Sequence, residues 1–322
     1  MYRKMLVPLD GSELAEVVFT YAKELAGRLD IDVILLHVVN PVLQGFTPMH
    51  RAYIEHAAEI LQREARSVQE RSKGAKPQVK PVETRSELTV GYAPDEILRC
   101  AEKNKVDLIL MASHGRSGLR RWTMGSVADK ILRTSQIPVW LVRAGVPDEI
   151  LYDKWPKKTI LVPLDGSELA ESVLPHVQTL SEQRGPERVD VVLVRVCEPP
   201  AIPSYYAPEL PDAPLNWGEY MQKETARCKQ TATDYLAEVA KKLKAMGVNN
   251  VKSEVLVGKS ADQLVDYANK NPFNLIVMAT HGRSGLSRWV YGSITENVLQ
   301  GVSCPILLIR TNPSNQPVKK EK

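Results

Sequence analysis

The chain has 322 residues, of which 43% are hydrophobic, and its 42 Lys and Arg side chains against 38 Asp and Glu leave a formal net charge of +4. Residues 1–150 and 151–322 each carry 21 basic and 19 acidic side chains, so neither half has the concentrated positive charge of a nucleic-acid-binding domain. The apolar runs fall far short of the roughly 18 residues that cross a bilayer, and no apolar leader follows Met1, so we expect a cytoplasmic protein without membrane association.

The four cysteines, Cys100, Cys197, Cys228 and Cys304, are scattered, and no C-x-x-C pair occurs. This spacing predicts reduced thiols that pack individually rather than a disulfide framework or a zinc site.

In the first half, five short apolar runs alternate with four longer amphipathic segments. The runs predict strands at residues 5–9, 33–38, 79–84, 107–112 and 138–143. Between them, apolar residues recur every three or four positions, which predicts helices at residues 13–29, 51–72, 94–104 and 126–134. Strands that alternate with helices predict an α/β fold with a doubly wound parallel sheet and helices on both faces.

The sequence VPLDGSELAE, residues 7–16, joins the first predicted strand to the first helix. Ligands of an open parallel sheet bind outside the carboxyl ends of its strands. Asp10 is therefore a candidate acceptor for a ribose hydroxyl or an adenine amine. Alternatively, Asp10 caps the following helix together with Ser12, and the two roles are compatible.

The sequence MASHGRSGLRRWTMGSVADKIL, residues 111–132, follows the fourth strand and combines the parts of a phosphate-binding loop. Glycine permits close approach of a ligand, the first amides of a helix attract anions, and an arginine fork suits phosphate oxygens. The candidates are His114, Gly115, Arg116, Gly118, Gly125 and Ser126. His114 suits a hydrogen bond to backbone or phosphate better than general-base catalysis. Alternatively, Ser126 is an ordinary helix N-cap, and Trp122 fits packing in a core or an interface.

The second half repeats both sequences, which indicates a duplicated domain. VPLDGSELAE recurs letter for letter at residues 162–171, and HGRSGL recurs at residues 281–286. Strand-like runs recur as well, at residues 159–164, 189–196, 251–257, 274–279 and 305–310. The corresponding candidates are Asp165, His281, Gly282, Arg283, Gly285, Gly292 and Ser293, and Trp289 matches Trp122.

The duplication predicts the domain organisation. We expect domain 1 at residues 1–145, a linker at 146–158, domain 2 at 159–312 and a disordered tail at 313–322. Residues 199–218 hold six prolines and form an insertion of the second half. A lid, an interface arm and a flexible loop are the open interpretations of this insertion.

Motifs that would indicate other chemistry are missing from the sequence. The chain has no G-x-x-x-x-G-K-[ST] of a P-loop, no G-x-G-x-x-G after its first strand, no G-x-S-x-G and no H-E-x-x-H. We therefore expect neither NAD binding nor serine hydrolase chemistry nor a metal site formed by protein ligands.

The stretches KMLVPLDGSELAE and DLILMASHGRSGLRRWTMGSVADKILRTSQIPVWLVR, with their second-half counterparts, resemble the universal stress proteins in their tandem-domain form. The resemblance covers essentially the whole chain, once in each half. It implies two tandem five-stranded sheets, Rossmann-like and of the adenine nucleotide alpha hydrolase-like type, related by a pseudo-two-fold axis. It also implies that the fifth strands pair with each other, which would cover two apolar edges.

In nucleotide-binding members of the family, the loop after the fourth strand reads Gly-x2-Gly-x9-Gly-[Ser/Thr]. Alanine replaces the first glycine in both halves of this chain, at Ala112 and Ala279. Alanine would serve where only a small residue is needed, whereas a positive φ would cost about 1 kcal/mol for the methyl group.

The resemblance also implies that backbone groups bind the nucleotide. The backbones of Val38 and Val196 would recognise adenine, and the amides of Val127 and Ile294 would face phosphate. Pro8 and Pro163, next to the two aspartates, complete the implied nucleotide-binding set.

The function implied by the resemblance is that of an ATP-binding stress-response regulator with little or no catalysis, with Mg²⁺ as a candidate bridge between phosphates. One alternative is a slow ATP hydrolase or nucleotidyl transferase, with His114, His281, Asp10 and Asp165 as candidate bases or water-orienting groups. The other alternative is an interaction scaffold that binds no nucleotide. The expected partners are adenine nucleotide and the other half of the chain, with a homodimer left open and with neither nucleic acid nor membrane.

Overall fold

The computed structural model describes residues 1–73, 80–113, 124–143, 157–199, 217–280 and 292–310. Its first half consists of β1 (Lys4–Leu9), α1 (Glu13–Glu16), α2 (Val18–Leu29), β2 (Asp32–Val39), the 3-10 helix η1 (Pro41–Phe46), α3 (Thr47–Lys73), β3 (Thr84–Val90), α4 (Ala93–Lys103), β4 (Leu108–Ala112), α5 (Ser126–Thr134) and β5 (Val139–Val142).

The second half repeats this order of elements. It consists of β6 (Lys158–Pro163), α6 (Glu168–Glu171), α7 (Leu174–Arg184), the 3-10 helix η3 (Pro186–Arg188), β7 (Val189–Cys197), α8 (Trp217–Ala245), β8 (Asn250–Val257), α9 (Ser260–Lys270), β9 (Leu275–Ala279), α10 (Ser293–Gly301) and β10 (Ile306–Ile309).

Within the described residues, the strands form one ten-stranded sheet in the order β3-β2-β1-β4-β5-β10-β9-β6-β7-β8. All strand pairs inside each half are parallel, so the predicted α/β fold class is confirmed. β1 lies between β2 and β4, and β6 lies between β7 and β9. The chain therefore leaves each of these central strands for one side and later returns on the other, which makes the switch point where α/β sheets bind ligands.

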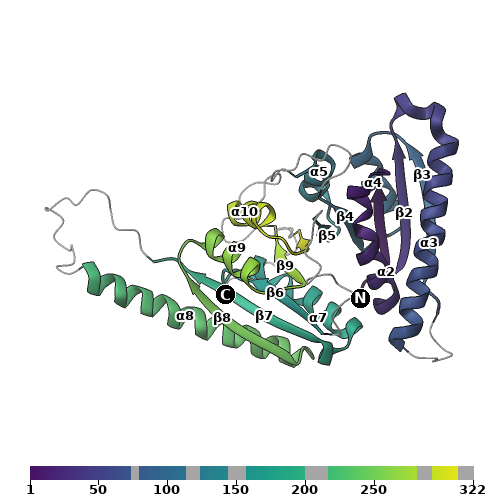
Figure 1. The fold of residues 1–322 in the computed structure, drawn as a ribbon. Helices are drawn as coiled ribbons and strands as arrows, with labels where there is room; N and C mark the ends of the chain where they lie inside the picture. The colour runs from purple at the N-terminus through teal and green to yellow at the C-terminus, as the bar shows by residue number, and fades with distance from the viewer. Residues whose placement is uncertain (74–79, 114–123, 144–156, 200–216, 281–291, 311–322) are drawn as a thin grey trace, which may run out of the picture.

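Helices cover both faces of the sheet because its central strands are apolar on both faces. All five residues of β4, LILMA, and all five of β9, LIVMA, are buried. One apolar layer packs α2, α3, α7 and α8 against the sheet, and a second packs α4, α5, α9 and α10 against the opposite face. In α5, for example, Ala128, Ile131 and Leu132 are buried at helical spacing. Figure 1 shows α3 along β2 and β3, and α8 along β7 and β8.

The two halves meet along β5 and β10, which pair antiparallel. The register places Trp140 opposite Leu307, and both side chains are fully buried. Arg143, just after β5, donates hydrogen bonds to the carbonyls of Val302 and Gln300 at the end of α10. The pairing turns two apolar edges, which would otherwise invite aggregation, into the middle of the sheet.

Further polar contacts between the halves lie near the N-terminus of the chain. The Tyr2 hydroxyl and Nδ1 of His176 in α7 are 2.7 Å apart. Gln183, also in α7, donates to the carbonyls of Tyr2 and Leu29 at 3.0 and 2.8 Å. Burial lowers the pKa of His176, which favours the neutral ring in this contact.

The predicted third strand is misplaced, since β3 begins at Thr84 rather than at residue 79. Two glutamines of α3 bind the backbone of the segment that is predicted to be a strand. Gln62 donates to the Val82 carbonyl at 2.7 Å, and Gln69 donates to the Lys80 carbonyl at 3.0 Å. The polar sequence TRSELTV of β3 carries little strand signal, because β3 is a half-exposed edge strand.

The first predicted helix, residues 13–29, is divided in the structure into α1 and α2, which meet at Val17. α3 is longer than predicted, whereas α5 spans the predicted residues. Nearly all of the predicted linker, the predicted tail and most of the proline-rich insertion lie outside the described residues. Among the described helices, none combines the length and apolar composition needed to cross a bilayer.

The β5–β10 junction predicts a large stability effect from one buried leucine. Leu307→Ala should lower the free energy of unfolding by about 2–5 kcal/mol, since it leaves a cavity against Trp140. Urea denaturation followed by circular dichroism measures the change. Val42→Ala, at a site that is 89% exposed, is the control and should change stability by less than about 0.5 kcal/mol. Equal effects of the two substitutions would contradict the role of the junction.

Candidate functional site

The turn after the first strand of each half has the same hydrogen bonds in both copies. Oδ1 of Asp165 accepts from the Ser167 amide at 2.9 Å and from its hydroxyl at 2.6 Å, and Ser167 Oγ accepts from the Ala170 amide at 3.1 Å. Asp10 and Ser12 repeat this arrangement in the first half. The predicted capping role is therefore present in both halves.

Glycine is required between the aspartate and the serine of this turn. Gly166 has a φ of +91°, and a Cβ there would lie 3.2 Å from the guanidinium of Arg195. The equivalent Gly11 has a φ of +79°. The turn, which glycine adopts without strain, holds Asp165 at the carboxyl end of β6, beside the switch point.

The helices that follow β4 and β9 begin with a glycine as N-cap. Gly125 caps α5, and Gly292 caps α10, neither with a side-chain hydrogen bond. The alternative that Ser126 is the N-cap is thus wrong, because Ser126 is the first helical residue. The Gly125 and Gly292 amides donate to the carbonyls of Ser113 at 2.9 Å and Thr280 at 3.1 Å, so these two amides do not serve an anion.

The following amides are the ones that remain for a ligand. The first N–H groups of an α-helix have no acceptor inside the helix. In α5 these belong to Ser126 and Val127, and in α10 to Ser293 and Ile294. Together with the helix dipole, they place positive potential at the carboxyl end of the sheet.

Ala112 and Ala279 occupy ordinary strand positions. Ala112 pairs with Val142, and Ala279 pairs with Ile309. Among the described residues other than glycine, positive φ values occur at Asp30 and Lys105. Alanine in place of the family glycine therefore causes no backbone strain here.

The ends of β2 and β7 present backbone groups toward the switch point. Leu164 donates to the Val194 carbonyl at 2.8 Å, and Cys197 accepts from Gly258 at 3.0 Å. Successive residues of a strand point their N–H and C=O groups to opposite edges, so those of Val196 point toward the β6 side. Because the β6–β7 ladder ends at Pro163 and Val194, no strand of the described residues pairs with the Val196 groups on that side. The same alternation holds for Val38, since the Val39 carbonyl accepts from Gly91.

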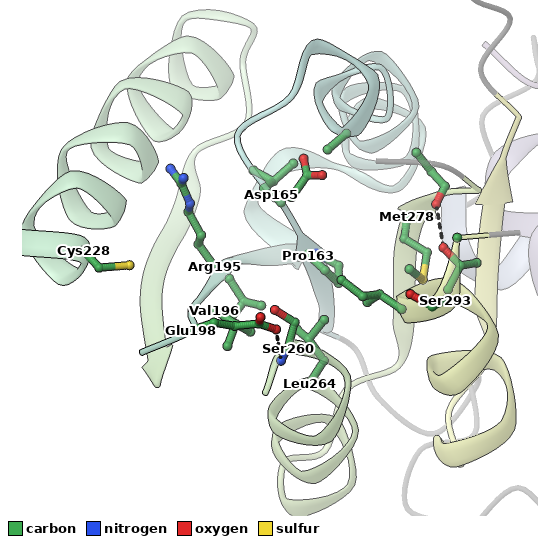
Figure 2. Close-up of a pocket in the computed structure, with 17 residues that line it drawn as sticks. Pro163, Asp165, Arg195, Val196, Glu198, Cys228, Ser260, Leu264, Met278 and Ser293 are labelled. Carbon is green, nitrogen blue, oxygen red and sulfur yellow. Dashed lines mark hydrogen bonds between the residues drawn. The ribbon is translucent and has the colours of Figure 1, made fainter. Parts of the chain in front are cut away.

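These features of the second half surround a cavity of about 440 Å³, a volume within the range of small-molecule sites. Figure 2 shows Asp165, Val196, Glu198, Ser260 and Ser293 around it. The lining residues are Pro163, Leu164, Asp165, Ala170, Val194, Arg195, Val196, Glu198, Cys228, Ser260, Leu264, Met278, Ala279, Gly292, Ser293, Ile294 and Thr295. The structure thus brings together the described second-half residues predicted from the sequence.

Beyond Asp165 and Ser293, the polar side chains that line the cavity are Arg195, Glu198, Ser260 and Thr295. Glu198 accepts from the Ser260 amide at 2.7 Å, and hydrogen bonds from Ser260 lower the pKa of Glu198. The Arg195 guanidinium lies 4.9 Å from the ring centroid of Tyr235 in α8. Tyr235 in turn donates to Glu171 at 3.2 Å, and burial followed by the Glu171 charge raises its pKa.

The equivalent of Arg195 in the first half is His37, as the strand registers show. Nδ1 of His37 lies 2.9 Å from the Leu9 carbonyl, and Nε2 lies 3.0 Å from Nδ1 of His50. Both rings are buried and stacked. The two halves therefore share their strand ends and helix starts but differ in the side chains beneath them.

The cysteine prediction is wrong for two of the four residues. Cys197, the last residue of β7, and Cys228 of α8 form a disulfide with their Cα atoms 5.9 Å apart. They are 31 residues apart in sequence, so no local spacing announces the pair. Cys100 and Cys304 are free and buried, as predicted.

Several predicted residues lie outside the described part of the chain, namely His114, Gly115, Arg116, Gly118, Trp122, His281, Gly282, Arg283, Gly285 and Trp289. Among the described residues, no group of three or more His, Cys, Asp and Glu side chains is arranged to hold a metal ion. No sequence motif points to the lining residues Arg195, Glu198, Cys228 and Ser260. Their approach depends on the packing of α8 and α9, which no motif encodes.

The universal stress protein family model matches residues 1–143 and 157–310. Over 311 residues the chain is 23% identical to Universal stress protein Rv2005c of Mycobacterium tuberculosis, with 95% of this chain and 96% of the relative covered. It is 28% identical over 155 residues to Universal stress protein MJ0577 of Methanocaldococcus jannaschii, with 44% of this chain and 96% of the relative covered. One relative thus spans both halves, and the other spans about one.

Two solved structures support the fold over nearly the whole chain. A universal stress protein from Archaeoglobus fulgidus superposes with a TM-score of 0.64 at 15% identity, covering 97% of each chain. The functionally unknown protein PA1789 of Pseudomonas aeruginosa superposes with a TM-score of 0.65 at 16% identity, covering 96% of this chain and 92% of its own. At these identities the likeness concerns the fold alone.

The Glu198–Ser260 contact predicts an acid-side pH dependence. The pKa of Glu198 should lie below that of an ordinary glutamate, so its contribution to stability is complete above the ordinary pKa and is lost as the pH falls through the folded-state pKa. A carbon-13 NMR titration of the carboxyl carbons measures it. Ser260→Ala removes the side-chain hydrogen bond, the largest cause of the shift, and should move the pKa back up. Ser253→Ala, at an exposed residue of β8, is the control. An unmoved pKa in Ser260→Ala would contradict the assignment.

Proposed function

Because this chain belongs to the universal stress protein family, we propose that it is an ATP-binding stress-response regulator with little or no catalysis, acting in the cytoplasm. The observation that carries the proposal is the cavity at the switch point of the second half. Strand-end backbone groups, a carboxylate and a helix N-terminus surround it. These are the kinds of group that adenine, ribose and phosphate need.

Each part of ATP has a counterpart among the lining residues. The N–H and C=O of Val196 offer adenine a donor and an acceptor, as its Watson–Crick edge requires. Asp165 accepts from ribose hydroxyls. The amides of Ser293 and Ile294, with the Ser293 hydroxyl, bind phosphate at the start of α10. Mg²⁺, when present, would be held mainly by phosphate oxygens and water.

A second site in the first half uses the equivalent residues. Asp10 follows β1, Val38 lies in β2, and Ser126 and Val127 begin α5. The repeated turn and the repeated glycine N-cap support this second site. Because β5 and β10 join the two halves, occupancy of either site can act on one connected sheet.

The hydrolase or nucleotidyl transferase alternative depends mainly on His114 and His281, which lie outside the described residues. Asp10 and Asp165 are held by serine hydroxyls and amides, an arrangement that favours a positioning role over proton transfer. Phosphate release measured with His114→Ala and His281→Ala tests the alternative directly. Rates equal to those of the unsubstituted protein would remove it.

ATP binding can be tested at the two helix starts separately. Isothermal titration of the nucleotide-stripped protein with ATP should give a Kd below about 1 mM. Ser126→Asp and Ser293→Asp each place a carboxylate where phosphate is expected, and each should weaken binding in its own half by about tenfold or more, which is about 1.4 kcal/mol. An acidic residue at a helix start stabilises the helix, so the loss cannot come from unfolding.

Asn249→Asp is the matched control for added charge. This exposed residue lies between α8 and β8, at the end of the strands opposite the cavity, and its substitution should leave the heat of binding unchanged. Absence of heat for the unsubstituted protein up to millimolar ATP would reject the proposed function.

The alanines at the family glycine positions give a separate prediction. Ala112→Gly and Ala279→Gly should not tighten ATP binding, because neither alanine carries backbone strain that glycine could relieve. They should instead lower the free energy of unfolding by about 0.5–1 kcal/mol each, since glycine loses more backbone entropy in a strand. Calorimetric Kd values and urea midpoints measure the two effects. A several-fold gain in affinity would show that the methyl group obstructs the ligand.

A further inference from the structure

The disulfide between Cys197 and Cys228 lies at the edge of the cavity in the second half. Cys228 is one of the cavity-lining residues, and Cys197 directly follows Val196. The bond joins the end of β7 to α8 at the place where the backbone of β7 faces the cavity. Figure 2 shows Cys228 on α8, across from Arg195 and Glu198 at the end of β7.

The disulfide lies in the part of α8 that contributes no buried side chain to the core. From Gly218 to Thr231 no residue of α8 is buried, whereas Ala232, Leu236, Val239 and Leu243 pack into the core. The contacts of Tyr235 with Arg195 and Glu171, and the ion pair of Lys242 with Glu171, also lie in this C-terminal part. The bond therefore fixes the N-terminal half of α8 to the sheet.

The first half carries apolar residues at the equivalent positions. The strand registers match Val39 with Cys197. Tyr53 binds Glu16 as Tyr235 binds Glu171, and Phe46 precedes Tyr53 by the same seven residues that separate Cys228 from Tyr235. Only the second of the two described halves can thus form this bond, which makes the first half an internal control.

The other two thiols are poorly suited to exchange. Burial raises the pKa of Cys100 to about 11 and that of Cys304 to about 12, so both stay protonated at neutral pH. Cys197 is also inaccessible, at 1% exposure, whereas Cys228 is half-buried. An attacking thiolate therefore reaches the pair through Cys228.

We propose that Cys197–Cys228 is a redox site for small dithiols, and that its state sets the nucleotide affinity of the cavity in the second half. A dithiol thiolate attacks Sγ of Cys228, the disulfide breaks, and Cys197 leaves as a thiolate that takes up a proton. The second thiol of the reductant then displaces Cys228, so the reductant ends as a disulfide. Two electrons and two protons pass to the cysteine pair.

The direction of the effect follows from the anchorage of α8. The oxidised bond holds the α8 wall of the cavity in place, so the ligand need not order it on binding. Reduction leaves the N-terminal half of α8 without its covalent link, and ATP then has to order that wall. By linkage, bound ATP favours the oxidised pair by the same factor. This part of the inference rests on the proposed function.

The test isolates each half with the helix-start variants. In Ser126→Asp, where ATP binds the second half, dithiothreitol should weaken binding by about fivefold or more, the lower end of typical coupling. In Ser293→Asp, reduction should leave the Kd of the first half unchanged. Cys197→Val with Cys228→Ser, which places the valine of the first half at position 197, should bind ATP as weakly as the reduced protein. Dithiothreitol should not change the Kd of this variant. Cys100→Ala, in the Ser126→Asp background, should keep the full redox response.

A measurement without ligand separates this inference from the proposed function. The total number of free thiols, counted after denaturation, should rise from two to four when the protein is reduced. Hydrogen exchange in residues 218–231 should become faster, while α3 stays unchanged. If ATP binds in neither redox state, the proposed function fails and exchange alone decides whether the bond clamps α8. Equal exchange in the two states, or an equal or tighter Kd after reduction, would overturn the inference.

Discussion

The cavity exists because β7 extends beyond the end of its pairing with β6. The β6–β7 ladder ends at Pro163 and Val194, while β7 continues to Cys197 paired with β8 alone. Backbone groups of a strand that has lost one neighbour need another partner, since unpaired buried peptide groups are costly. A ligand that carries a donor beside an acceptor suits that edge. The helix dipole of α10 and the carboxylate of Asp165 then act on whatever the edge holds.

The two halves keep this edge and differ in what supports it. Under the end of β2, a buried pair of histidines links Leu9 to α3. Under the end of β7, Arg195 stacks on Tyr235, and a disulfide holds α8. The backbone arrangement of the site is therefore duplicated, while the side-chain contacts that hold the neighbouring helix, α3 or α8, are different. The end of β2 and the end of β7 therefore differ in the side chains that support them.

The sequence predicted the α/β fold because its strongest signals are local. The apolar runs LILMA and LIVMA predict the central strands, and the two identical VPLDGSELAE segments indicate the duplication. The third strand was misplaced, because glutamines of α3 capture residues 80–83 and β3 itself is polar. The sequence also predicts the starts of α5 and α10, but it does not distinguish Ser126 from Gly125 as the N-cap, because both residue types are common at that position. Arg195, Ser260 and the Cys197–Cys228 pair depend on how α8 and α9 return to the sheet, and no local spacing contains that information.

The junction between the halves reaches the same helices that begin at the proposed phosphate sites. Arg143 of the first half donates to the last carbonyls of α10, and Arg310 of the second half donates to the Arg133 carbonyl near the end of α5. Each arginine thus meets the negative end of the helix dipole, while the positive end of the same helix points to the carboxyl edge of its own half. An anion at Ser293 and the guanidinium of Arg143 therefore act on opposite ends of one nine-residue helix. A shift of that helix along its axis would therefore change both the lining of the cavity and the contact with the other half.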